Sequence, residues 1–280
     1  MSLKKLGNLV NTFTIVLVFM LFLLLVVPLN NFLEGYDFAE MDSRYISGII
    51  VRIFLSLGVI ILIKKHGLSR FSSPKNKPYN LYVLVFPLIV VGAGFTANWE
   101  VYLGAEKLTV LLFFGKHLSV GLFEEVLFRG FVFPKCLIYF KNKRNALVKS
   151  SIMTGSLFGF VHLINLFREP NVMHLFGEPD FIFNIISQVF AVMVIGVFLA
   201  GILVRTGNII FSIFMHFLIN SSLGSGELRL AELSIPDSEG SLWLMSALII
   251  ILFAFIFIWG LMMLRESDTK RIYSLIEGDN

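Results

Sequence analysis

Apolar runs, each close to the length of a membrane span, alternate along the chain with short polar connections. A helix needs about 20 predominantly apolar residues to cross a bilayer. Most of eight runs come near that length: residues 9–30, 46–63, 80–98, 108–134, 146–166, 181–204, 208–222 and 241–264. The pattern predicts an all-α polytopic membrane protein with about eight transmembrane helices. We expect residues 1–280 to form a single integral membrane domain within the lipid bilayer.

The composition agrees with this prediction. Hydrophobic residues make up 56% of the 280 positions and charged residues only 15%, and the 30 phenylalanines exceed what one soluble core of this length uses. The formal net charge is +4, but the basic residues cluster in short connections beside helix ends. That placement favours orientation and lipid contact, so we expect no nucleic-acid partner.

Lysine and arginine mark every second connection. Lys4 and Lys5 precede the first run, and the connections around residues 64–77 and 135–144 are rich in both residue types, whereas the connections between these are mainly acidic. Basic connections stay in the cytoplasm, so both termini, including the charged tail 265–280, are expected to be cytoplasmic. Short connections without a eukaryotic sorting signal favour a bacterial plasma membrane.

Two adjacent acids interrupt the fourth apolar run. Glu124 and Glu125 stand in Gly121-Leu-Phe-Glu-Glu-Val-Leu-Phe-Arg-Gly130. A central charged residue costs about 2.5–3.5 kcal/mol to insert, and each apolar neighbour returns only roughly 0.3–0.6 kcal/mol. Other parts of the chain must therefore solvate or pair these acids, which makes them candidates for a functional site.

Helical spacing places the two acids on different faces of the predicted helix. Arg129 lies four residues after Glu125, about 40° around the helix, but about 140° from Glu124. We expect Arg129 to pair with Glu125, and for these two a structural role is favoured over direct catalysis. Glu124 then faces another side. A buried carboxylate beside a like charge accepts a proton readily, which suits a general base.

Two histidines in apolar runs are further candidates. His216 and Asn220 are four residues apart, so both can donate hydrogen bonds to one developing oxyanion. Glu124 with His162 can polarise and deprotonate a water, although spacing alone does not decide which histidine serves the water. Phe158, four residues before His162, is expected to pack against the site. His117 follows Lys116 and is expected at the membrane boundary.

These residues form three short motifs, which follow one another on successive predicted helices: Glu124-Glu125-x-x-x-Arg129, Phe158-x-x-x-His162 and His216-x-x-x-Asn220. Together they resemble the CPBP intramembrane proteases, also called the CAAX protease and bacteriocin-processing (Abi) family, which includes the type II CAAX prenyl endopeptidases. The resemblance covers about residues 105–222. Each motif alone is short, but three in sequence within membrane helices are specific.

The resemblance implies an intramembrane glutamate endopeptidase that needs no metal or other cofactor, with a water-containing conical cavity in an eight-helix bundle. Residues 105–222 would form its catalytic core. Carried over position by position, Glu124 is the general base, His162 helps to activate water, and His216 with Asn220 forms the oxyanion hole. Glu125, Arg129 and Phe158 match supporting positions. The substrate would be a membrane-associated peptide or protein.

Three other classes of function stay open. A zinc protease would use the same side chains, but the chain has no His-Glu-x-x-His pair. A proton-coupled transporter also carries intramembrane acids, yet the sequence lacks paired interrupted helices in two related halves. A non-proteolytic scaffold, such as a bacteriocin immunity or regulatory protein with a membrane protein partner, would act through helix–helix binding.

Overall fold

The computed structural model describes residues 3–35, 40–69, 80–141, 143–163, 179–224, 252–264 and 272–273. Within these residues every regular element is helical, and none is a strand. In chain order they are α1 (Leu3–Phe22), η1 (Leu23–Leu25), α2 (Val26–Glu34), α3 (Glu40–Lys65), η2 (Tyr82–Leu84), α4 (Val85–Ala97), α5 (Trp99–Gly104), α6 (Lys107–Glu125), η3 (Val126–Val132), α7 (Phe133–Phe140), α8 (Ala146–Val161), α10 (Pro179–Thr206) and α11 (Ile209–Leu223). A last apolar helix spans Leu252–Met263.

Several of these helices have the composition of membrane spans. Three helical stretches are long and apolar enough to cross a bilayer: Gly7–Glu34, Met41–Lys65 and Ile185–Thr206. Shorter apolar helices cover Tyr82–Ala97, Ala146–Val161, Ile209–Leu223 and Leu252–Met263. The predicted all-helical membrane protein is therefore confirmed, whereas the number of eight spans stays a prediction.

Large apolar side chains cover the outside of the bundle. Phe54 on α3 is 71% exposed, and Ile61 and Leu111 are each about two-thirds exposed. A soluble monomer rarely exposes such surface over many helices. These side chains are suited to contact with lipid, in agreement with an integral membrane protein.

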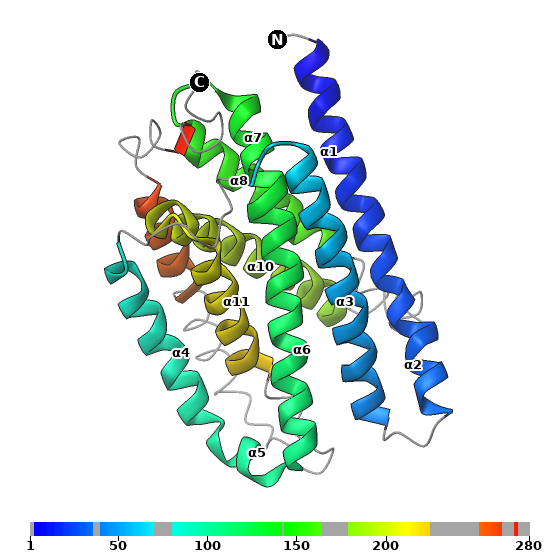
Figure 1. Ribbon diagram of the computed structural model, residues 1–280. Coiled ribbons are helices and arrows are strands. Elements are labelled where there is room, and N and C mark those ends of the chain that lie inside the picture. The colour runs from blue at the N-terminus through cyan, green and yellow to red at the C-terminus, as the bar shows by residue number, and fades with distance from the viewer. Residues whose placement is uncertain are drawn as a thin grey trace.

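The predicted run 108–134 is one continuous helical rod at the centre of the molecule. It passes from α6 through η3 to α7 and ends only at Phe140. Figure 1 shows α6 between α3 and α11, the two helices against which it packs most extensively. Every residue of η3 is buried. The two acids therefore lie inside the bundle and away from lipid.

Helices α8 and α10 make the closest backbone contact of the site region, and three glycines permit it. A Cβ atom on Gly159 would lie 2.6 Å from the Val189 carbonyl oxygen, and one on Gly196 would lie 2.9 Å from the Cα of Gly155. Small residues at such spacing let membrane helices approach closely. This contact brings the backbone of α10 up to the side chains of the central rod.

Candidate active site

Glu124 and Glu125 are the last residues of α6, where the helix widens into the π-helical η3. Their exposed fractions are 7% and 0%. Pro134, near the start of α7, explains the widening, because it has no N–H to donate and its ring crowds the carbonyl four residues earlier. Such π-helical turns are rare and occur frequently at functional sites.

Arg129 makes the predicted pair with Glu125. Its Nη1 lies 2.9 Å from Glu125 Oε1, and both side chains are fully buried. The alignment is that of an ion pair, since Nη1 is not directed at the oxygen as a hydrogen-bond donor. Its Nη2 donates to the carbonyl oxygen of Gly196 on α10 at 2.9 Å. Arg129 thus ties the acid-bearing helix to the backbone of α10.

His216, on α11, lies between the two acids. Its Nδ1 is 2.8 Å from Glu125 Oε1, and its Nε2 is 3.6 Å from Glu124 Oε2. Gly121 makes this position accessible, because a Cβ atom there would lie 3.0 Å from the backbone of α11. Residues separated by 91 positions in the chain therefore form one charged cluster.

Phe158 joins this cluster to the second histidine. The ring centroid of Phe158 is 4.8 Å from that of His162 and 5.9 Å from that of His216, both in edge-on geometry. The guanidinium of Arg129 lies over the same ring, with its Cζ at 4.8 Å. Both imidazoles and the guanidinium therefore border a single phenyl ring, which agrees with the predicted packing role.

The backbone fixes the orientation of the His162 ring. Its Nδ1 lies 2.7 Å from the carbonyl oxygen of Phe158. A carbonyl only accepts, so Nδ1 carries the proton and donates it, which leaves Nε2 as an acceptor in the neutral ring. His162 follows directly after α8 and is half-buried. No hydrogen bond joins it to Glu124.

Asn220 lies one turn beyond His216 on α11 and is half-buried. Among the described residues its carboxamide has no hydrogen-bond partner. Two side chains from outside α11 bind the end of this helix. Tyr102 Oη donates to the Ser221 carbonyl oxygen at 2.7 Å, and Asn98 Nδ2 lies 3.5 Å from the Ser222 carbonyl oxygen. These bonds satisfy carbonyls that a helix end leaves unpaired.

The two carboxylates differ in the side chains that contact them. Oε1 of Glu125 contacts both a guanidinium and an imidazole, whereas Oε2 of each acid is buried and has no hydrogen-bond partner among the described residues. The 3.6 Å gap between that oxygen and His216 Nε2 is too long for a hydrogen bond. Of the two acids, Glu124 is therefore the one without a guanidinium or imidazole within hydrogen-bond distance among the described residues. No group of three side chains suited to hold a metal ion occurs among the described residues.

Two buried polar residues near the site were not among the predicted ones. Arg52 on α3 is 7% exposed and is the single charged residue of the apolar run 46–63, which is the signal that identifies it. His117 was expected at the membrane boundary, but it is 5% exposed, with its ring 4.3 Å from that of Phe113. The spacing explains this burial, because His117 lies seven residues, or about two helical turns, before Glu124 and therefore on the same face of the helix.

Residues 106–222, from the start of α6 to the end of α11, match the family model of the type II CAAX prenyl endopeptidase Rce1-like proteins. This match confirms the resemblance that the three motifs indicate. The matched segment contains all the residues of the cluster described above. No curated protein and no solved structure matches the chain.

Proposed function

Because residues 106–222 match the family model of the Rce1-like type II CAAX prenyl endopeptidases, we propose that this protein is an intramembrane glutamate endopeptidase. It hydrolyses a peptide bond of a membrane-associated peptide or protein. The observation that carries the proposal is the difference between the contacts of the two acids. Arg129 and His216 both contact Glu125 Oε1, at 2.9 and 2.8 Å, whereas among the described residues Glu124 has no guanidinium or imidazole within hydrogen-bond distance.

Glu124 is the general base of this reaction. Its carboxylate takes a proton from water while the water oxygen attacks the carbonyl carbon of the scissile bond. His162 accepts a hydrogen bond from the same water through Nε2, since its Nδ1 is held by the Phe158 carbonyl. The proton then passes from Glu124 to the leaving amine as the carbon–nitrogen bond breaks.

His216 and Asn220 stabilise the oxyanion that forms on the carbonyl oxygen. The imidazolium form of His216 fits its surroundings, because Nδ1–H donates to Glu125 and Nε2–H faces the gap beside Glu124. In that form two carboxylates balance one guanidinium and one imidazolium, so the buried cluster is neutral overall. The carboxamide of Asn220 supplies a second N–H donor from the same stripe of α11.

The proposal places this chemistry in an eight-helix bundle with a water-containing conical cavity, in a bacterial plasma membrane and with both termini in the cytoplasm. Water must reach Glu124, because hydrolysis consumes it. The three long apolar helices and the four shorter ones supply most of the predicted bundle.

Cleavage of a fluorogenic library of C-terminal membrane peptides by the purified protein tests the proposal. The parent, Glu124→Gln and a chelator-treated sample are compared. Asp42→Asn is the matched control, because Asp42 is a buried acid that accepts a hydrogen bond from Thr109 at 3.0 Å on the α3–α6 contact. We expect turnover in the parent, the control and the chelator-treated sample, and a loss of at least about 100-fold in Glu124→Gln.

Other outcomes assign the alternatives. Turnover that the chelator removes would favour a metal-dependent protease. A parent without turnover, whose cellular effect survives both Glu124→Ala and His162→Ala, would favour a scaffold that acts through helix–helix binding. Either result overturns the glutamate mechanism.

A further inference from the structure

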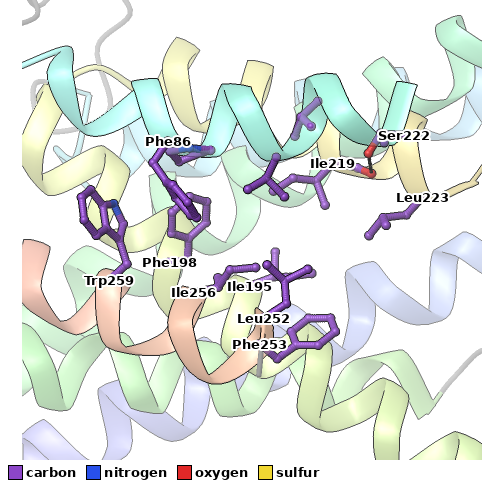
Figure 2. A pocket seen from close by; sticks show the side chains of 14 residues that line it. Phe86, Ile195, Phe198, Ile219, Ser222, Leu223, Leu252, Phe253, Ile256 and Trp259 are labelled. Atoms are coloured by element: carbon purple, nitrogen blue, oxygen red, sulfur yellow. Dashed lines mark hydrogen bonds between the residues drawn. The ribbon is translucent and has the colours of Figure 1, made fainter. Parts of the chain in front are cut away.

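A cavity of about 330 Å³ lies between α4, α10, α11 and the helix Leu252–Met263. Figure 2 shows its wall, in which phenylalanine, isoleucine and tryptophan side chains converge from these four helices. None of the acids or histidines of the candidate active site lines it. The cavity lies behind the catalytic helices, on the side of α11 that faces α4.

The lining of the cavity is suited to a hydrocarbon. Apart from the hydroxyl of Ser222, its side chains are glycine, proline, aliphatic and aromatic. The Ser222 hydroxyl already donates to the carbonyl oxygen of Ile219 at 3.4 Å. An apolar cavity of about 150 Å³ is enough to bind benzene, so this larger space can hold an alkyl chain.

A second hollow of about 210 Å³ adjoins the first through a shared residue, Trp259. Its lining is different in character, because Arg205 and Asn80 take part in it. Among the described residues, neither the indole Nε1–H of Trp259 nor the Oδ1 of Asn80 has a hydrogen-bond partner, and both atoms are buried. A buried polar atom without a partner is costly, so this hollow is suited to a polar group.

The polar hollow lies where helices end. Arg205 is the last residue but one of α10, and Asn80 lies shortly before η2. In a membrane protein such positions border the headgroup region, where tryptophan and arginine commonly anchor. An apolar cavity beside a hollow that is lined by a guanidinium and hydrogen-bonding groups, with Trp259 in the wall of both, has the polarity of an amphiphile.

We propose that the two hollows together bind one anionic phospholipid. An acyl chain fills the cavity between α4, α10, α11 and the last helix. The phosphate lies against the Arg205 guanidinium and accepts a hydrogen bond from Trp259 Nε1, and a headgroup hydroxyl donates to Asn80 Oδ1. Arg205 supplies the attraction for negative charge, because a guanidinium binds phosphate through several N–H donors.

The bound chain would touch the helices that carry the active site. Ile219 of α11 lies one turn from His216, and Ile195 of α10 is adjacent to Gly196, whose carbonyl binds Arg129. Lipid binding at this place therefore supports the packing of α10 and α11. It does not supply a group to the reaction.

Quenching of Trp259 fluorescence by brominated lipids tests the site. The full chain contains three tryptophans, so Trp99→Phe and Trp243→Phe leave Trp259 as the single reporter. The protein is reconstituted in phosphatidylcholine vesicles that contain either dibromo-phosphatidylglycerol or dibromo-phosphatidylcholine at equal mole fraction. We expect about fivefold preference for the anionic lipid, which one basic residue near a membrane surface provides.

Two variants separate a specific site from general attraction. Arg205→Gln should remove the preference, whereas Arg144→Gln should retain it, because Arg144 is exposed in the connection between α7 and α8. Equal quenching by both brominated lipids in the parent would overturn the proposal, whether or not the Arg205 variant folds. Relief of quenching by a prenyl alcohol but not by unlabelled phosphatidylglycerol would also overturn it, and would assign the cavity to an isoprenoid.

Discussion

Arg129 holds three parts of the protein together with one guanidinium. It pairs with Glu125 on its own helix, donates to the backbone of Gly196 on α10 and stacks on Phe158 of α8. The side chain is completely buried, so none of these contacts is weakened by water. At such a depth a charge is tolerated only when it is paired.

Replacing Arg129 by alanine should lower the stability of the whole folded protein. Glu125 would remain as a buried charge without its cation, which costs about 3–5 kcal/mol. We expect a lower folded yield and a lower thermal midpoint of the purified protein. Arg144→Ala removes an exposed arginine and should change neither. Equal yield and midpoint in both variants would exclude a structural role for Arg129.

Sequence reasoning identifies the Glu125–Arg129 pair because both residues lie on one helix, where spacing defines direction. The same reasoning cannot place His216 between the two acids, since that contact depends on how α11 packs against α6. The environment of His117 illustrates the same limit. A neighbouring lysine suggests a boundary residue, but the ring packs on Phe113 inside the bundle.

Helix packing at the site depends on residues without side chains. Gly155, Gly159 and Gly196 permit α8 and α10 to meet, and Gly121 permits α6 to approach α11. These glycines are recognisable in the sequence, but their partners are not. The π-helical turn cannot be predicted from the sequence either. Pro134 indicates that the helix is locally irregular, but it does not indicate which kind of irregularity forms.

Gly159→Ala should weaken the contact between α8 and α10. The added Cβ would lie 2.6 Å from the Val189 carbonyl oxygen, which is backbone and cannot turn aside. Overpacking of this kind costs about 1–3 kcal/mol, and it should lower the thermal midpoint measured in detergent.

Gly92→Ala is the control, since nothing lies within 4 Å of the Cβ it would add to α4. It should leave the midpoint unchanged or raise it slightly, because alanine favours helix. If both variants unfold at the same temperature as the parent, the close α8–α10 contact is not required.

The charge pattern makes a prediction about the whole molecule. Cys136 is the only cysteine and is buried, so Cys136→Ala gives a background for single-cysteine labelling of intact cells. Lys143→Cys and Glu106→Cys lie in exposed connections at opposite ends of the rod formed by α6, η3 and α7. An impermeant maleimide should label Glu106→Cys at once and Lys143→Cys only after the membrane is opened. The reverse order would invert the proposed topology.

The long-range partners of α6 also bear on how the protein is made. Arg129 binds a carbonyl 67 residues further along the chain, and Glu125 contacts an imidazole 91 residues further along. The ribosome therefore completes α6 well before either partner exists. During that interval two acids and one arginine remain without their full compensation. We expect α6 to enter the bilayer late, at the translocon together with α10 and α11, so that the charged segment is assembled as part of a group of helices.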